Sequence, residues 1–244
     1  MFALLQFLDK IGMFKQSKLT LILEIILFLF VAAGIGYYFY TQKSAPDVIV
    51  QDKQEKNFFE FKPQCPDLTQ EQITKFQERF DKVKEFLATT PDRMGAWMEL
   101  GLVRKGLCDY QGAADVWTYV GEIRPENSLS FANLGDLYTH FLVDYPKAEA
   151  AYLRAIENEK HDVNYFRNFF ELYYYSYTEK KHLAEKVLLD GLNYNPDSHD
   201  LMTLLASYYR DNGNKEKAIE YFNKVLELNP DNEAVKRELE GLTK

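Results

Sequence analysis

The sequence predicts an all-α protein, in which helix–turn–helix repeats stack into a solenoid behind one membrane-spanning helix. Three observations predict this class. Prolines recur 34 residues apart, at Pro91 and Pro125 and again at Pro196 and Pro230; one apolar pattern returns between them; and residues 19–40 carry almost no charge. A hydrophobic content of 46% with 27% charged residues over 244 positions is typical of a folded domain with an appendage.

Charge and cysteine content exclude one class of partner and one way of stabilising the fold. The formal net charge is −8, and it is uneven, because residues 1–43 sum to +2 and the rest to −10. Binding a nucleic acid requires a basic face, and residues 44–244 are strongly acidic, which excludes nucleic acid as their partner. Two cysteines, Cys65 and Cys108, cannot form a disulfide framework. One bridge could join them, but thiols so far apart in sequence are more often unpaired.

Residues 19–40, LTLILEIILFLFVAAGIGYYFY, are expected to form a transmembrane helix that is retained as a signal-anchor. At ~1.5 Å per residue they reach ~33 Å, enough for a bilayer core of ~30 Å. The run Tyr37–Tyr40 suits an interfacial aromatic belt. A cleaved signal peptide with Ala32 and Gly34 at the cut is the alternative, but the apolar run exceeds the roughly 7–15 residues of a signal-peptide core.

The lysines favour an amino terminus in the cytoplasm and a folded domain outside it. Residues 1–18 would then be a short cytoplasmic or interfacial segment. Three lysines lie on each side of the span, but the closer flanking pair, Lys15 and Lys18, lies on the amino-terminal side. Glu24 inside the span is either a functional carboxylate or a neutral or snorkelling side chain near the interface. Ala32 and Gly36 would permit helix pairing, and hence a homo-oligomer.

Four units beyond the linker share one pattern of apolar and small residues. Spacings of three and four place these residues on one stripe of a helix, so each unit is expected to hold two amphipathic helices joined by a short turn. Small residues such as Gly101 and Gly135 would let the paired helices approach closely. The units span residues 94–127, 128–162, 163–198 and 199–232.

The 34-residue period with W-x2-L-G-x2-Y, A-x3-F and P resembles the tetratricopeptide repeat. Trp97-x-x-Leu100-Gly101 opens the first unit, and Ala218-x-x-x-Phe222 marks the last. The resemblance covers residues 94–232. It implies a right-handed superhelical solenoid whose concave groove, lined mainly by the first helix of each unit, binds a protein or peptide. The departures from the pattern are Arg104 at an aromatic position, one extra residue in the turn of the second unit and two in that of the third.

Segments on either side of the repeats fit the same plan. Residues 67–93 are expected to form an amino-terminal capping helix, opened by a capping box at Thr69 and Gln72. Residues 233–244 are expected to form a polar-backed carboxy-terminal cap. Residues 41–66 show no helical period, which predicts a flexible linker. The linker contains three phenylalanines that could dock on the repeats, namely Phe58, Phe59 and Phe61.

No pattern for catalysis, a cofactor or a metal is found. The four histidines, His140, His161, His182 and His199, lack the spacing of metal ligands. Nucleophile elbows, phosphate loops and dinucleotide fingerprints are also missing from the sequence. The protein is therefore not expected to be an enzyme.

The resemblance to the tetratricopeptide repeat favours a membrane-anchored scaffold of the cell envelope, acting in translocation, complex assembly or a chaperone-like role. The alternatives are a cytosol-facing docking receptor for protein import and a regulatory subunit of a membrane enzyme.

The family's groove positions, carried over residue by residue, give a mixed apolar, aromatic and weakly charged surface. The candidate residues are Met98, Leu102, Asp136, His140, Arg167, Glu171, Tyr174, Tyr175, Ser207 and Arg210, with Lys105, Ala132, Thr139 and Thr203 beside them. In the family's chaperone adaptors, basic and amide side chains hold a C-terminal carboxylate, whereas here Met98, Leu102, Ala132 and Asp136 occupy the matching positions. An extended or helical peptide held by apolar and aromatic contacts fits better. A merely solvated face is the alternative.

The aromatic stretch NYFRNFFELYYYSY, residues 164–177, is expected to be the first helix of the third unit. Phe166, Phe169 and Tyr173 belong to the packing stripe. Phe170 stands where the other units have glycine or alanine, which predicts a locally wider helix pair. The candidates for a binding platform on the groove side are Arg167, Glu171, Tyr174 and Tyr175.

Overall fold

The computed structural model of the protein describes residues 57–243. The expected transmembrane helix 19–40 lies outside the described residues, as do residues 1–18 and most of the linker. Residues 57–243 contain ten α-helices and no strand. Among these helices, none joins the length to the apolar character that crossing a bilayer requires. The predicted all-α repeat fold is thus confirmed for this part of the chain.

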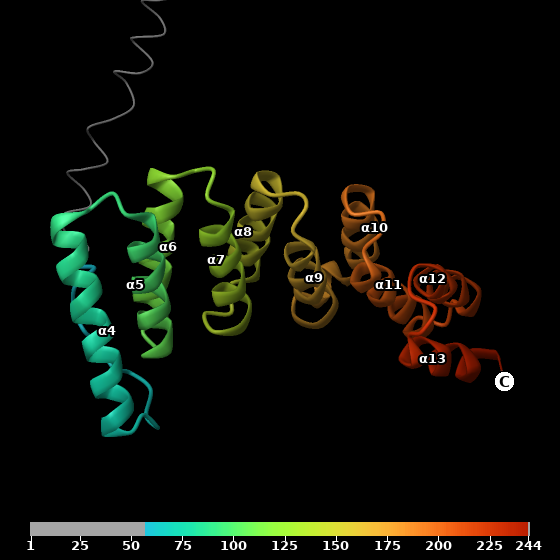
Figure 1. Ribbon diagram of the computed structural model, residues 1–244, viewed down its shortest axis with the longest axis horizontal. Helices are drawn as coiled ribbons and strands as arrows, with labels where there is room; N and C mark the ends of the chain where they lie inside the picture. The colour runs from blue at the N-terminus through green and yellow to red at the C-terminus, as the bar shows by residue number, and fades with distance from the viewer. Residues whose placement is uncertain (1–56, 244) are drawn as a thin grey trace, which may run out of the picture. The chain divides into compact units, whose positions relative to one another are not determined.

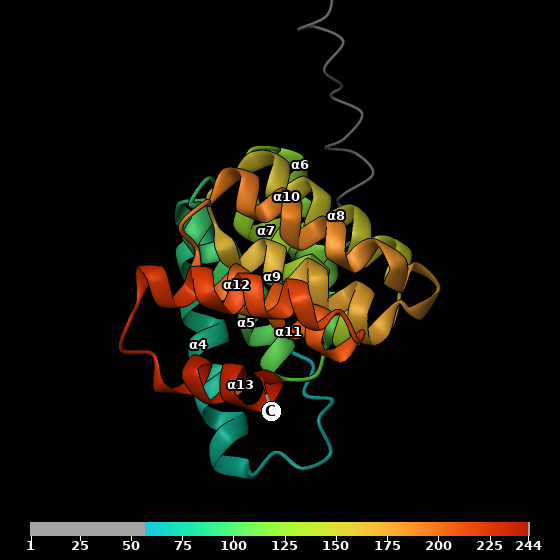
Figure 2. The same cartoon turned by 90° about the vertical axis from the view of Figure 1, so that its right-hand side faces the viewer.

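The helices form four successive pairs between two single helices, in chain order (Figures 1 and 2). The first single helix is α4, Gln70–Thr89, and the last is α13, Glu233–Thr243. We call the first helix of each pair its A helix and the second its B helix. The pairs are α5 (Met94–Gly106) with α6 (Tyr110–Ile123), α7 (Ser128–His140) with α8 (Tyr145–Asn158), α9 (Val163–Glu171) with α10 (Ala184–Tyr194), and α11 (His199–Asp211) with α12 (Lys215–Leu228).

Side-chain caps determine where most of these helices begin. The predicted capping box of α4 is confirmed, because Thr69 Oγ1 accepts a hydrogen bond from the Gln72 N–H and Gln72 Oε1 accepts one from the Thr69 N–H. Five other helices begin after a residue whose side chain accepts from the N–H three positions later. These residues are Asp109, Asn127, Asp144, Ser198 and Asn214. The helix starts are therefore encoded locally.

Small residues on the A helices let large rings of the B helices pack against the backbone. A Cβ atom placed on Gly135 would lie 2.5 Å from Cε1 of Tyr152, and one placed on Gly101 would collide with the ring of Trp117. Trp117 and Tyr152 are 0% and 1% exposed. The close approach predicted at these glycines is confirmed.

The third unit departs from this pattern. Phe170 stands at the position of Gly101 and Gly135, and it is only 2% exposed. Its A helix, α9, has 9 residues, whereas α5 and α7 have 13 each. A π turn, Leu172–Ser176, continues α9, and a 3₁₀ segment, Thr178–Leu183, leads to α10. The larger side chain and the two-residue insertion are thus taken up by shorter helices and a non-α connection.

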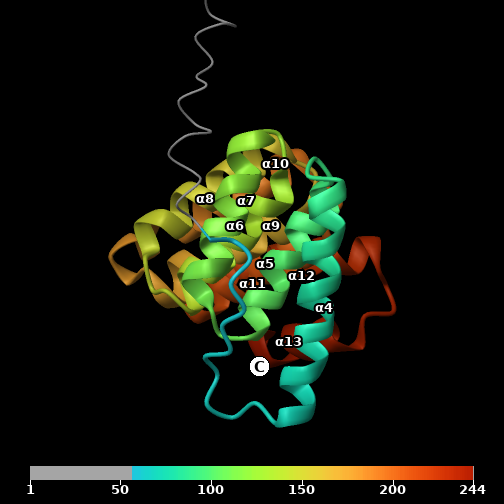
Figure 3. The ribbon, with the colours of Figure 1, turned by 90° about the vertical axis from the view of Figure 1, so that its left-hand side faces the viewer.

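Residues 58–68, which we call the strap, cross the first pair before the chain turns into α4 (Figure 3). The docking predicted for the phenylalanines is confirmed. The ring centroid of Phe58 lies 5.5 Å from that of Trp97 and 5.2 Å from that of Tyr119. Phe61 lies 5.4 Å from Phe80 of α4. The flexible linker expected over residues 41–66 therefore does not extend through the strap.

Arg104, the departure from the repeat pattern in the first unit, holds the strap in place. Its guanidinium Nη2 donates to the carbonyl oxygens of Phe58, at 2.7 Å, and Glu60, at 3.1 Å. Nη1 forms an ion pair with Asp109, and both side chains are buried. An aromatic side chain has at most one polar donor hydrogen and could not donate both hydrogen bonds, so the arginine and the docked strap belong together.

The sequence left one disulfide possible but favoured unpaired cysteines, and that preference is wrong. Cys65 of the strap and Cys108 of the α5–α6 turn form a disulfide, with Cα atoms 5.0 Å apart. The backbone N–H groups of Gln64 and Cys65 both donate to the carbonyl oxygen of Leu107, at 2.8 and 3.2 Å. The expectation rested on the sequence separation of 43 positions, and the folded-back strap brings the two cysteines together in space.

Candidate binding surface

The candidate groove residues lie on the A helices and on the π turn that continues α9. They are not equally accessible. Met98 is 7% exposed and packs in the core, as do Ala132 and Thr139 at 7% and 4%. Leu102 is 45% exposed and Tyr175 is 68% exposed. The surface that a partner can touch is therefore smaller than the set suggested by the sequence.

An ion-paired cluster joins the first two A helices. Lys105 of α5 pairs with Asp136 of α7, and Nε2 of His140 lies 3.8 Å from Asp136 Oδ1. The Lys105 ammonium also lies 4.8 Å from the ring centroid of Phe141, a residue that the sequence did not suggest. These charges are directed at one another, so they serve mainly to connect α5 and α7.

The charges on the last two A helices are also largely paired. Arg167 donates to Asn164 Oδ1 at 2.5 Å and lies 3.6 Å from the carboxylate of Asp200 on α11. Arg210 donates to Asp211 at 2.9 Å and pairs with Glu238 of α13. Thr203 and Ser207 are half-buried between these groups.

Three tyrosines of the π turn and α11 lie together, and Tyr175 is exposed whereas the other two are half-buried. Tyr174 and Tyr175 come from the π turn, and Tyr208 comes from α11. The ring centroids of Tyr174 and Tyr175 are 4.8 Å apart, and those of Tyr174 and Tyr208 are 5.6 Å apart, both in edge-to-face geometry. We call Tyr174, Tyr175 and Tyr208 the aromatic patch. Because it joins two neighbouring units, the patch requires the stacking of the third and fourth pairs.

A lysine and two carboxylates surround the patch. The Lys181 ammonium of the 3₁₀ segment lies 4.1 Å from the ring centroid of Tyr174. The pKa of the Tyr175 phenol is raised, first by burial of the hydroxyl and then by Tyr174 and the negative charges of Asp211 and Glu171. The phenol is therefore neutral at pH 7 and can donate a hydrogen bond.

Most of the other rings of the aromatic stretch are core, as the sequence predicted. Phe166, Phe169, Phe170 and Tyr173 are each at most 4% exposed. The hydroxyl of Tyr173 donates to Glu149 Oε1 at 2.8 Å. The stretch thus separates into a buried half that holds the third unit together and an exposed half that offers ring faces.

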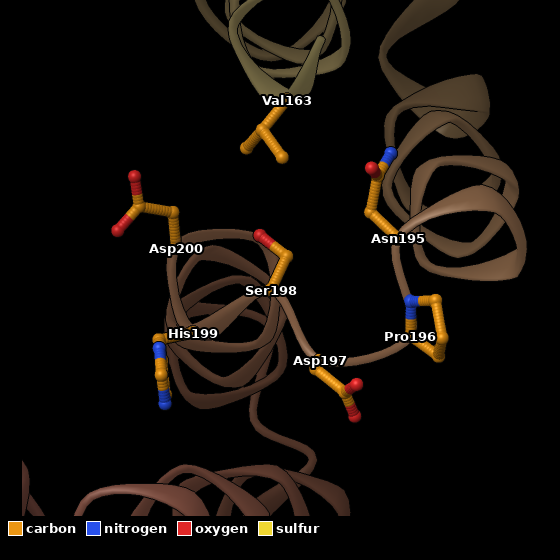
Figure 4. A pocket seen from close by; sticks show the side chains of 7 residues that line it. All are labelled: Val163, Asn195, Pro196, Asp197, Ser198, His199 and Asp200. Atoms are coloured by element: carbon orange, nitrogen blue, oxygen red, sulfur yellow. The ribbon is translucent and has the colours of Figure 1, made fainter. Parts of the chain in front are cut away.

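A shallow depression lies away from the patch, where the α10–α11 turn meets the start of α9 (Figure 4). Val163, Asn195 and Ser198 are among its lining residues, and its volume is about 470 Å³. Ser198 Oγ caps α11, and Asn195 Nδ2 donates to the carbonyl oxygens of Lys160 and Gly191. Since its central polar groups serve the turn itself, we do not assign the depression a ligand.

Sequence reasoning missed two members of the site. Tyr208 immediately follows the candidate Ser207, so its position on α11 could have suggested it. Lys181 lies in the inserted segment, where the repeat pattern gives no register, and no signal in the sequence places it over Tyr174. Among residues 57–243, no group of His, Cys, Asp or Glu is arranged to hold a metal ion.

Comparison with known proteins supports the repeat fold. Residues 199–232, which contain α11 and α12, match the family model of the tetratricopeptide repeat. No curated protein matches the chain. A solved structure of MamA, residues 41 to the end, from Desulfovibrio magneticus RS-1 is 18% identical, with 64% of this chain and 85% of that chain covered and a TM-score of 0.50. Another structure of MamA is 17% identical, with 66% and 95% covered and a TM-score of 0.50.

A third structure, YrrB, is described as a TPR protein with an unusual peptide-binding site. It is 19% identical, with 68% of this chain and 84% of that chain covered, at a TM-score of 0.49. Identities this low concern the fold alone. Residues 199–232 are thus similar to a tetratricopeptide repeat in sequence, and the helical array is similar in fold to the two MamA structures.

Proposed function

We propose that the protein is a non-enzymatic scaffold, anchored in a membrane through residues 19–40, whose A helices bind a protein or peptide partner. The aromatic patch carries this proposal. Most charged groups on the same face are paired with one another, whereas Tyr175 is 68% exposed beside two further tyrosines. Tyrosine is enriched at protein interfaces because it offers a large apolar ring with a polar end.

We further propose that the repeats lie outside the cytoplasm. The disulfide between Cys65 and Cys108 supports this side, because such bonds persist in oxidising compartments and are rare in the cytosol. It argues against a cytosol-facing docking receptor. A regulatory subunit of a membrane enzyme would use the same surface, with the enzyme as its partner.

Labelling of intact cells tests the topology. Both native cysteines form the disulfide, so a Ser44→Cys variant adds the single free thiol of the chain. A membrane-impermeant maleimide is expected to label it in intact cells as strongly as a permeant one does. Labelling by the impermeant reagent only after lysis would place the repeats in the cytoplasm and refute the envelope location.

Photocrosslinking tests the binding surface. With p-benzoylphenylalanine at position 175 of the full-length protein, we expect one discrete adduct whose partner segment is then sequenced. The control is the same residue at position 194, since Tyr194 is 42% exposed but belongs to the B helix α10. Adducts from position 194 and none from 175 would refute the A-helix surface.

A further inference from the structure

The aromatic patch and Glu171 also indicate the chemistry of the ligand. We propose that together they bind a cationic side chain, lysine or arginine, of the partner polypeptide. This inference rests on the proposed function, since it specifies the ligand of the same surface.

The π turn gives the site its shape. The N–H of Tyr177 donates to the carbonyl oxygen of Leu172 at 2.6 Å, which closes a wider turn than that of an α-helix. Within it, Leu172 and Tyr173 remain buried at 0% and 4%, while Tyr175 is 68% exposed. Single π turns are rare and occur frequently at functional sites, where they redirect side chains. Here the turn directs one tyrosine outward without removing its neighbours from the core.

Ring contacts hold the open tyrosine in a defined orientation. Tyr174 is stacked on the buried ring of Phe170, with centroids 5.2 Å apart and an interplanar angle of 14°. The ring of Tyr174 also has two edge-to-face contacts, one with Tyr175 at an interplanar angle of 82° and one with Tyr208 at 65°. An oriented ring loses little conformational entropy on binding, which favours its use as a contact surface.

A cation already occupies one ring of the cluster. Lys181 Nζ lies 4.1 Å from the centroid of Tyr174, within the range where a ring face attracts an ammonium group. Within residues 57–243, no lysine or arginine lies over the more exposed ring of Tyr175. The ring of Tyr174 thus already binds an ammonium group of the protein itself, whereas the ring of Tyr175 is open to a ligand.

Glu171 supplies a negative charge beside the open ring. It is half-buried one turn before Tyr175 and has no ion pair among the described residues, whereas Asp136, Asp200 and Asp211 of the other A helices do. Glu171 and Asp211 both interact electrostatically with the Tyr175 hydroxyl. A cationic side chain on Tyr175 could pair with Glu171, whereas an apolar ligand would desolvate this carboxylate without compensation.

Binding of defined peptides tests this inference. The protein is the full chain in nanodiscs of neutral lipid, at physiological ionic strength. The probe is a fluorescein-labelled octapeptide that alternates lysine and glycine, and its matched control carries norleucine, an uncharged apolar side chain, in place of each lysine. We expect the lysine peptide to bind and the norleucine peptide to bind at least about tenfold more weakly.

Variants locate the binding. Tyr175→Ala is expected to weaken the lysine peptide about 3- to 30-fold, and Glu171→Gln about 2- to 5-fold. Tyr175→Phe keeps the ring face and should bind like the native protein. The matched controls are Tyr194→Ala, another exposed tyrosine, and Glu126→Gln, the same charge change at an exposed position of another unit; both should leave affinity unchanged.

The possible failures are distinguishable. Equal weakening by Glu171→Gln and Glu126→Gln would show diffuse attraction to an acidic protein and overturn the inference. Equal binding of both peptides, each weakened by Tyr175→Ala, would overturn the cationic ligand but support the proposed peptide surface. No binding of either peptide would also overturn the inference, and the crosslink from position 175 would then decide the proposed function.

Discussion

The first and third units differ in whether their aromatic side chains are covered or exposed to solvent. In the first, Trp97 and Tyr119 are covered by the strap, which Arg104 and a disulfide hold in place. In the third, no such segment lies over Tyr175 within the described residues, and a π turn directs this ring to solvent. Each unit departs from the repeat pattern, at Arg104 and at Phe170.

The difference shows how a repeat array assigns separate tasks to units of one design. The departure in the first unit adds cross-links at the amino-terminal end of the described array, beside the single helix α4. The departure in the third unit shortens the helices and exposes rings, which favours recognition over packing. We therefore expect substitutions in the first unit to affect chiefly stability, and those at the exposed half of the third unit to affect chiefly binding.

Phe170 should show the largest effect. Phe170→Ala removes a ring that is 2% exposed and is expected to lower the free energy of unfolding by about 3–5 kcal/mol. Phe86→Ala is the control, because Phe86 is 45% exposed and should cost about 1 kcal/mol or less. Urea denaturation followed by circular dichroism measures both. Equal shifts of the two midpoints would contradict the core role of Phe170.

The disulfide is expected to stabilise the first unit by a similar amount. It closes a loop of 43 residues, for which chain entropy predicts about 4 kcal/mol. Both tryptophans of the chain, Trp97 and Trp117, lie in this unit, so their fluorescence reports its unfolding alone. Cys65→Ser with Cys108→Ser should lower the fluorescence midpoint, and dithiothreitol should lower the native midpoint equally. A midpoint that dithiothreitol leaves unchanged would show that the strap holds without the bond.

Substitutions at two glycines of α5 are expected to change stability by smaller amounts and in opposite directions. Gly101→Ala places a methyl group against the buried ring of Trp117 and is expected to cost about 1–3 kcal/mol. At Gly95 nothing lies within 4 Å of an added Cβ, so Gly95→Ala should stabilise α5 by roughly 0.5–1 kcal/mol. Tryptophan fluorescence during denaturation follows both. Opposite signs are expected; two stabilising changes would mean that close helix contact at Gly101 is not required.

The smallest effects on stability are expected at two tyrosines of the π turn, Tyr173 and Tyr175. Tyr173→Phe removes a hydrogen bond to Glu149 and should cost about 1 kcal/mol, whereas Tyr175→Phe should change stability by less than about 0.5 kcal/mol. Circular dichroism during urea denaturation compares the two. A larger loss for Tyr175→Phe would mean that its hydroxyl supports the fold, and that this residue is not free for a partner.

The sequence predicted the repeat architecture well because its signals are local. Periodic apolar residues, paired small residues such as Gly135 and capping side chains such as Thr69 act within one or two helices. The same periodicity correctly assigned Phe166 and Tyr173 to the core. It also identified Phe58 as a residue unsuited to a solvated linker.

The features that the sequence did not predict depend on contacts between distant segments or on an irregular backbone. The pairing of Cys65 with Cys108 requires the strap to fold back, and nothing in their spacing encodes that. The burial of Met98 depends on neighbouring elements that its helical position does not reveal. Lys181 reaches Tyr174 through a π turn and a 3₁₀ segment, for which a pattern based on α-helical periods has no register.

Hydrogen–deuterium exchange of the full-length protein in nanodiscs, with and without the lysine–glycine peptide, tests the central claim most directly. Exchange resolves the units separately without any substitution. We expect the peptide to protect amides within residues 170–177 and 203–211 and to leave residues 95–119, the strap-covered part of the first unit, unchanged. Protection centred on residues 95–119, or none within 170–177, would contradict the division of tasks between the two units.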